Sequence, residues 1–132
     1  MISIQLETNL SLEEYQFILD DSGLGLRRPM HDPEFLNRVI QGSNLVVTAR
    51  DEGRIVGLLR GLTDFSYRTF VADLAVAKNH QRQGIGKKLL EFARNLAPEA
   101  RLFLFSAEDS EPFYQKLGFD LHNRCYQLKS KY

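Results

Sequence analysis

Hydrophobic and polar residues follow two different periods along the chain. Ile2, Ile4 and Leu6 alternate with polar residues, as in a half-buried strand. Four further runs are rich in apolar and β-branched residues and are predicted as strands: 45–49, 54–63, 68–76 and 102–106. Turn residues at 51–53 separate the first two of these runs, which are therefore predicted to pair as a hairpin.

Apolar residues at helical spacing predict four helices. They are expected from the capping box at Ser11 to the stop at Gly23, from Pro33 to Gly42, from Gly84 to Leu96, and from Pro112 to Leu117. Gly118 suits the position after the last helix, and residues 119–128 are predicted as a terminal strand or hairpin. The order β, α, α, β, β, β, α, β, α, β predicts an α+β fold with helices on the faces of a sheet.

The composition fits one soluble globular domain. The 132 residues are 43% apolar and 26% charged, enough for one core, so residues 1–132 are predicted as a single domain. Lys plus Arg and Asp plus Glu both number 17, so no overall basic field favours nucleic acid. Cys125 is the only cysteine, which excludes an internal disulfide, and we expect no metal site. No apolar run has membrane length, so a cytoplasmic protein without a membrane partner is predicted.

A glycine-rich turn lies between a buried strand and a helix. The strand ends in Asp73-Leu74-Ala75-Val76, and the turn reads Gln81-Arg82-Gln83-Gly84-Ile85-Gly86-Lys87-Lys88. Glycine lets the backbone approach a ligand closely, and the first amides of a helix lack internal partners and lie at the positive end of its dipole. The turn is therefore predicted to bind phosphate.

Three phosphate motifs compete for this turn. A P-loop fails because Gln81 occupies the place of its first glycine and Lys88 that of its Ser or Thr. A dinucleotide fingerprint fails because Leu89 occupies the place of its third glycine. The remaining pattern, [QR]-x-x-G-x-[GA], is that of the GNAT acetyltransferases.

The chain resembles the GNAT superfamily in a second motif as well. The family's D-L-A-V type strand precedes the turn, and its F-Y-x-x-x-G-F helix matches Phe113 to Phe119, so that the resemblance covers roughly residues 45 to 119. It implies a layered α/β/α acyl-CoA N-acyltransferase fold with a mixed central sheet and helices on both faces. It also implies transfer of an acetyl group from acetyl coenzyme A (acetyl-CoA) to a primary amine by direct attack.

The resemblance also implies which residues bind the cofactor. The strand residues expected beside the pantetheine arm are Leu74, Ala75 and Val76. The turn residues expected around the pyrophosphate are Gln81, Arg82, Gln83, Gly84, Ile85, Gly86 and Lys87, and two downstream residues, Ser110 and Phe113, complete the expected cofactor site. Many relatives carry Asn where this chain has Ala107, so a hydrogen bond to pantetheine is either missing or supplied by Ser110. A tight helix start without a ligand is the alternative interpretation of the two glycines.

Two residues are candidates for the chemistry. Tyr114 matches the family tyrosine that protonates the departing thiolate, with core packing as its alternative. Asp73 is the nearest candidate for the general base. Asp64, His31 and Glu108 are weaker ones, for which a turn residue, a loop histidine and a solvated acid are the simpler interpretations. A backbone N–H of Leu74 or Ala75 is expected to meet the developing oxyanion.

The acceptor amine is not identified by the sequence. Arg60 lies inside an apolar strand, where it either faces the acceptor or packs its stem against the surface. Arg27, Arg28 and His31 lie where this fold forms its acceptor wall, and either bind an anionic acceptor or are solvated. Two further hypotheses stay open: a coenzyme A binding or sensor module without turnover, and a homodimer.

Overall fold

Five strands form one mixed sheet in the order β1-β2-β3-β4-β5. The computed structural model describes all of residues 1–132. The strands are β1 (Ile2–Leu6), β2 (Leu45–Asp51), β3 (Arg54–Thr63), β4 (Arg68–Val76) and β5 (Arg101–Leu104). The first four run antiparallel to their neighbours, and β5 runs parallel to β4. The predicted strands up to residue 76 are therefore confirmed.

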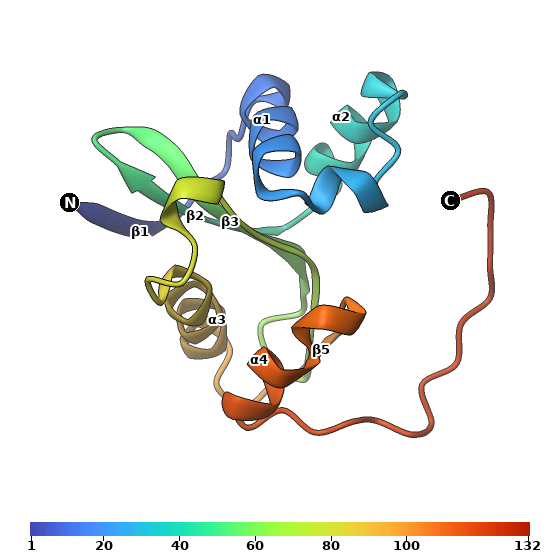
Figure 1. Ribbon diagram of the computed structural model, residues 1–132. Helices are drawn as coiled ribbons and strands as arrows, with labels where there is room; N and C mark the ends of the chain where they lie inside the picture. The colour runs from blue at the N-terminus through green and yellow to red at the C-terminus, as the bar shows by residue number, and fades with distance from the viewer.

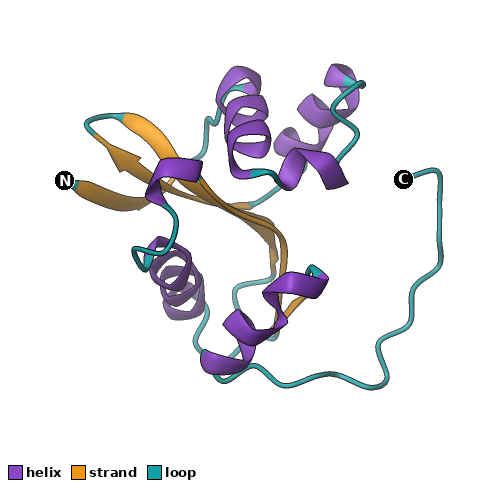
Figure 2. Cartoon of the chain, in the orientation of Figure 1, coloured by secondary structure: helices purple, strands orange, loops and turns teal.

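Helices cover both faces of this sheet. They are α1 (Leu12–Ser22), α2 (Pro33–Gln41), α3 (Ile85–Leu96) and α4 (Glu111–Lys116), with short 3-10 helices η1 (Leu24–Arg27), η2 (Lys78–His80) and η3 (Glu108–Ser110). α1 and α2 lie on one face and α3 and α4 on the other (Figures 1 and 2). The α+β fold with helices on both faces of a mixed sheet is confirmed. No helix combines the length and the apolar character needed to cross a membrane.

Side chains at the predicted helix ends act as caps. The Ser11 hydroxyl accepts the Glu14 N–H at 3.1 Å, and the Asp32 carboxylate accepts the Phe35 N–H at 3.2 Å. Gly23 ends α1 with φ +90°, a conformation that costs glycine little. Local sequence signals therefore fix where α1 begins and ends and where α2 begins.

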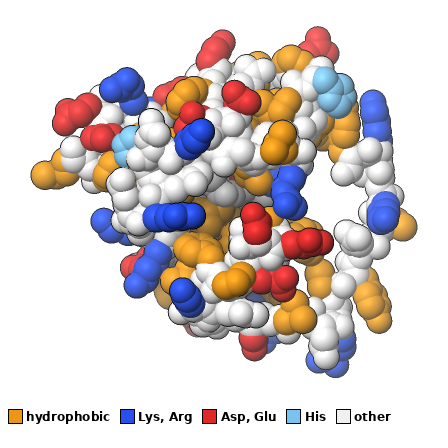
Figure 3. Space-filling model, viewed as in Figure 1, with side chains coloured by type: hydrophobic (Ala, Val, Ile, Leu, Met, Phe, Trp, Pro, Cys, Tyr) orange, Lys and Arg blue, Asp and Glu red, His pale blue; other side chains and the backbone are white.

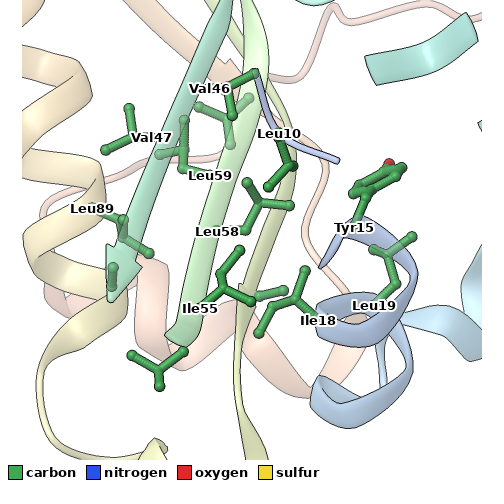
Figure 4. Close-up of a cluster of buried hydrophobic side chains, with 14 of the residues drawn as sticks. Leu10, Tyr15, Ile18, Leu19, Val46, Val47, Ile55, Leu58, Leu59 and Leu89 are labelled. Atoms are coloured by element: carbon green, nitrogen blue, oxygen red, sulfur yellow. The ribbon is translucent and has the colours of Figure 1, made fainter. Parts of the chain in front are cut away.

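The hydrophobic core lies on both sides of β2 and β3. On the α1 side, Ile18 points toward the strand that carries Leu58, and Tyr15 and Leu19 lie beside it (Figure 4). On the α3 side, Leu89 lies near Val47 and Leu59 (Figure 4), and all six named aliphatic residues are fully buried. Each such side chain contributes about 1.5–3 kcal/mol by leaving water. The core thereby holds α1 and α3 at fixed positions against the strands that carry the site.

β4 and β5 separate part-way along their length. Their pairing ends at Val71 and Leu104, whereas β4 continues to Val76. On the other side of β4, a bulge between Arg60 and Gly61 interrupts the β3 register. The last five residues of β4 therefore keep β3 on one side and have no strand on the other.

The predicted strand or hairpin at 119–128 is wrong. No secondary structure follows α4, and the tail arches away from the body to end near α2 (Figure 1). At its end the Tyr132 hydroxyl donates to Asp32 at 2.9 Å, and its ring lies 4.5 Å from that of Phe35. A strand needs a ladder partner, and this tail does not lie along β5.

The predicted bounds of β5 and α4 also differ from the structure. The strand expected at 102–106 forms at Arg101–Leu104, because pairing with β4 ends there and leaves Phe105 largely exposed. α4 begins one residue before the expected Pro112 and ends one residue before Leu117. Gly118 follows with φ +91°, as its expected role requires.

Candidate active site

The free edge of β4 exposes backbone hydrogen-bonding groups. The Ala77 N–H donates to Val56 O on β3 at 2.8 Å. Because backbone groups alternate in direction along an antiparallel strand, those of Ala75 also face β3, and those of Leu74 and Val76 point to the free edge. This edge can hydrogen-bond an extended ligand as an added strand would.

The glycine turn lies directly after this edge and is tied to it. The Gln81 amide donates to Val76 O at 3.0 Å, which couples the turn to the end of β4. Arg82 has φ +64° and Gly84 φ +83°, so the chain turns sharply before α3. Residues 81–84 are exposed. The turn is an open surface feature that the Gln81 side chain ties to Val76 O and, at 3.5 Å, to Ser22 O.

The first turn of α3 has no capping side chain. Gly84 is its N-cap and makes no side-chain hydrogen bond. Lys88 N–H, bonded to Gly84 O at 3.1 Å, is the first amide of the helix with a carbonyl partner. The amides of Ile85, Gly86 and Lys87 are therefore free to bind an anion at the positive end of the helix dipole.

Phe113 and Gly86 bring α4 and α3 together beside the free edge. A Cβ added at Gly86 would lie 3.3 Å from the Phe113 ring, 3.9 Å from Val76 and 4.0 Å from Leu74. Four of the predicted cofactor residues therefore lie close together. Because the Phe113 ring packs directly on Gly86, a larger side chain at position 86 would have to displace it.

Tyr114 follows Phe113 and lies partly buried. Its ring makes edge-on contacts with Phe113 at 5.1 Å and Phe119 at 5.5 Å. Burial raises the pKa of its hydroxyl above the ordinary value of about 10. The hydroxyl makes no hydrogen bond to another protein group, so its proton is not directed to an acceptor within the protein. Ser110, the last predicted cofactor residue, is the N-cap of α4, and its hydroxyl caps nothing.

Asp73 lies at the centre of a buried ion-pair cluster. Its Oδ1 accepts the Arg28 Nε–H at 2.7 Å, and its Oδ2 accepts the Arg60 Nε–H and the Tyr15 hydroxyl, both at 2.5 Å. Burial alone would raise the pKa of Asp73, but the two guanidinium groups and the tyrosine hold it below its usual value. Both oxygens are occupied by donors, which is the environment of a permanent anion.

A cleft of about 490 Å³ opens in front of this cluster, and we call it the arginine cleft. It is lined by Tyr15, Leu24, Arg27, Arg28, Pro29, Phe35, Leu36, Val39, Arg60, Phe70, Val71, Ala72, Phe105, Ser106, Ala107 and Tyr132. These residues come from α1, η1 and the loop after it, α2, β3, the region where β4 and β5 separate, and the end of the C-terminal tail. The cleft and the cluster of Gly86, Phe113, Leu74 and Val76 thus lie along the same strand, with Asp73 next to Leu74.

Comparison with known proteins identifies the family. The family model described as "Acetyltransferase (GNAT) domain" matches residues 20–127. The chain belongs to the GNAT acetyltransferase family. It is 30% identical over 95 residues to GCN5-related N-acetyltransferase 3, chloroplastic, of Arabidopsis thaliana, covering 70% of this chain and 39% of that protein. This chain therefore spans well under half the length of that curated GNAT relative.

Solved structures of GNAT proteins have the same fold. The GNAT-family acetyltransferase SP0256 from Streptococcus pneumoniae TIGR4 superposes with a TM-score of 0.81 at 28% identity, over 98% of this chain and 97% of that one. Aminoglycoside N-acetyltransferase AAC(6′)-Iy in complex with CoA gives a TM-score of 0.74 at 14% identity, covering 99% and 95% of the two chains. The second likeness concerns the fold alone.

The structure places the other expected GNAT residues at different sites. Asp64 accepts the N–H groups of Ser66, Tyr67 and Arg68, so it stabilises the β3–β4 turn. His31 lies 6.1 Å from the Tyr132 ring. Arg28 and Arg60 both line the arginine cleft, so Arg60 faces the cleft and not the outer surface.

Sequence reasoning missed Tyr15 as a partner of Asp73 and missed the aromatic lining of the arginine cleft. Tyr15 has the spacing of an ordinary core residue, and only its hydroxyl distinguishes it. Phe35 lies on α2, Phe70 on β4 and Phe105 just after β5, and no local sequence pattern joins them. One signal in the sequence could have revealed the ion pair. Arg60 and Asp73 are charged residues within apolar runs on consecutive strands, and the register of a hairpin brings them opposite each other.

Asp73→Asn is expected to lower the free energy of unfolding by about 3 kcal/mol, because it leaves two arginines without their anion. Urea denaturation at pH 7 measures this change. In the wild type the folded-state pKa of Asp73 is lowered, so its contribution is present above about pH 4 and is lost as the pH falls through the folded-state pKa.

Asp109→Asn, at an exposed carboxylate, serves as the matched control and should change stability by less than about 0.5 kcal/mol. An Asp73→Asn protein as stable as the wild type would contradict the structural role of the cluster.

Proposed function

We propose that the chain is an N-acetyltransferase that transfers an acetyl group from acetyl-CoA to a primary amine. The observation that supports this proposal is that three features lie next to one another. They are the free edge at Leu74 and Val76, the unpaired amides of the α3 first turn, and Tyr114 on the neighbouring helix. Acetyl-CoA supplies an acyl group activated as a thioester.

The residues present fit the cofactor. The free backbone groups of Leu74 and Val76 match the amide-rich pantetheine arm, and the amides of Ile85, Gly86 and Lys87 match a pyrophosphate. A Cβ at Gly84 would meet no atom within 4 Å, so the space in front of the turn is open. Phe113 packs against Gly86, which suits an apolar wall beside the bound cofactor.

Two groups of the chain are suited to the chemistry of acyl transfer. The Leu74 N–H points to the free edge and the Ala75 N–H to β3, which favours Leu74 as the donor that stabilises negative charge on the acyl oxygen. The Tyr114 hydroxyl holds its proton because burial raises its pKa, and it can give that proton to a departing sulfur.

We propose a structural role for Asp73 in place of proton abstraction. Its lowered pKa makes it a weak base, and its oxygens already accept hydrogen bonds from Arg28, Arg60 and Tyr15. An amine entering through the arginine cleft would therefore lose its proton to water in the cleft. This view differs from the expectation that Asp73 is the general base.

Gly86→Val and Tyr114→Phe are expected to separate binding from chemistry. Valine at position 86 would project toward Phe113, Val76 and Leu74 and should weaken acetyl-CoA binding by roughly 10-fold or more, measured by calorimetry.

Tyr114→Phe should leave acetyl-CoA binding within about twofold of the wild type and lower kcat roughly 100-fold, measured by thiol release. For the wild type, the raised pKa of Tyr114 keeps kcat from falling until above about pH 10.

A binding or sensor module without turnover would give a different result. It would bind acetyl-CoA through Gly86, yet thiol release would be absent with every amine and unaffected by Tyr114→Phe. Tight binding of acetyl-CoA by Gly86→Val would count against the proposed cofactor site itself.

We further propose that the C-terminal tail pairs with a second copy of the chain. Leu121, Tyr126 and Leu128 are 88%, 92% and 98% exposed, and the outer edge of β5 has no strand beside it. A cleft of about 600 Å³ near this edge is lined in part by Leu102 and Phe103. Exposed apolar residues and an open sheet edge on one chain complement each other in a pair of chains.

The contacts of Tyr132 with α2 favour a second copy over the chain's own β5. They hold the end of the tail on the far side of an opening that is visible in Figure 3. The apolar residues in the middle of the tail are thereby kept away from the β5 edge of the same chain.

Light scattering at about 50 µM is expected to give the mass of a dimer for the wild type and of a monomer for Leu128→Lys, because a charge replaces an apolar contact. Leu26→Lys is the matched control, since Leu26 is 94% exposed but lies on η1, and it should remain dimeric. A monomeric wild type, or equal masses for both variants, would refute pairing through the tail.

A further inference from the structure

The charges that line the arginine cleft are all positive. Its 16 lining residues include three arginines, Arg27, Arg28 and Arg60, and no Asp, Glu or Lys. Behind this wall, Asp73 is the one carboxylate that pairs with them. Three guanidinium groups against one carboxylate leave a net charge of +2 on the cleft. At its rim, Asp32 and Arg38 flank Phe35 and offset each other.

Two of the three arginines, Arg60 and Arg27, have side-chain nitrogens without a protein acceptor. In the third, Arg28, each of the three side-chain nitrogens already donates a hydrogen bond, to Asp73, Arg27 O and Ala72 O. Arg60 donates through Nε to Asp73 and through Nη1 to Ser43, which leaves Nη2 without a protein partner. Arg27 is exposed and makes no side-chain hydrogen bond. Arg60 Nη2 and Arg27 are therefore available to an anionic ligand.

The rest of the cleft is apolar and largely aromatic. Phe70 and Phe105 meet edge-on at 5.4 Å, and Phe35 and Tyr132 lie 4.5 Å apart. Rings of this kind bury the apolar body of a ligand and add edge-to-face contacts to an aromatic one. A ligand that satisfies the cleft therefore combines an anionic group with an apolar group.

We propose that the acceptor is an amine that carries a carboxylate next to an apolar, preferably aromatic, group, as in an apolar amino acid. The proposal rests on the N-acetyltransferase function proposed above. The carboxylate meets Arg60 Nη2 and Arg27, and the apolar group packs among Phe35, Phe70 and Phe105. Guanidinium groups bind planar carboxylates in a two-point geometry, which favours a carboxylate over a less directional anion.

The same charges oppose polycationic acceptors. A polyamine or an aminoglycoside would bring several positive charges to a cleft that already has an excess of them, without a carboxylate to receive them. Some GNAT relatives are named for histone or aminoglycoside substrates, so the inference separates this chain from those proteins by a property of its own cleft.

Binding of reaction products tests this inference without requiring turnover. N-acetyl derivatives of phenylalanine, tyrosine and leucine are compared with their carboxamides by calorimetry, with N-acetylspermidine as the cationic probe. Each acid is expected to bind roughly 10-fold more tightly than its amide, because a charge-assisted hydrogen bond replaces a neutral one. The phosphate ester of N-acetylphenylalaninol distinguishes a phosphate site and should bind more weakly than the best acid.

Arg27→Gln is expected to reduce the acid-over-amide preference by about threefold or more, while the affinity for the amide stays unchanged. Arg54→Gln, at an exposed arginine at the start of β3, is the control and should preserve the preference. Amides that bind as tightly as their acids, or N-acetylspermidine that binds more tightly than either, would overturn the inference.

Turnover assays then separate this inference from the proposed function. Thiol release from acetyl-CoA should have a higher kcat/KM with phenylalanine than with phenylalanine amide or spermidine. Efficient release with spermidine alone would support the acetyltransferase function and overturn the carboxylate preference. Acid-selective product binding without thiol release from any amine would support the preference and refute the function.

Discussion

The buried carboxylate of Asp73 is the constraint on which the site depends. A charge inside a protein is tolerated only when it is paired and hydrogen-bonded, and here Arg28, Arg60 and Tyr15 fulfil that requirement. These three partners come from the segment after η1, from β3 and from α1. The cluster therefore holds three separate parts of the chain against β4, at the point where β4 has left β5.

The two surfaces proposed to bind the acyl donor and the acceptor meet at this point on β4. The face of the strand that carries Asp73 turns two arginines toward the cleft on the α1 and α2 side. The free edge one residue later presents the backbone of Leu74 and Val76 and leads into the glycine turn. An acyl donor held along the edge and an acceptor held in the cleft would approach each other beside Leu74, within reach of the α4 helix that carries Tyr114.

Much of the fold could be predicted from local sequence signals. Ser11, Asp32 and Gly23 determine their helix ends through contacts within a few residues, and the glycine turn precedes α3 as expected. The absence of the predicted terminal strand could not be foreseen, because the residues of a segment show only that it can form a strand. Whether it does so depends on a partner elsewhere, and β5 does not provide one within this chain.

The role of Asp73 shows a second limit of sequence reasoning. Its position beside the glycine-turn strand is compatible with a general base, and its neighbours along the chain say nothing against that role. Its three hydrogen-bonding partners lie 13, 45 and 58 residues away, so its environment follows from the tertiary structure. The register of the β3–β4 hairpin accounts for the contact with Arg60 only. The contacts with Tyr15 and Arg28 depend on how α1 and η1 pack against the sheet.

Amide hydrogen exchange with and without acetyl-CoA tests the central claim most directly. The account predicts that acetyl-CoA slows exchange in two segments, residues 82–88 and residues 74–76, because their free N–H groups become hydrogen-bonded. Exchange in the β1–β2 region should stay unchanged, since it lies at the other edge of the sheet. Unchanged exchange at 82–88 under saturating acetyl-CoA, or protection confined to another surface, would contradict the claim.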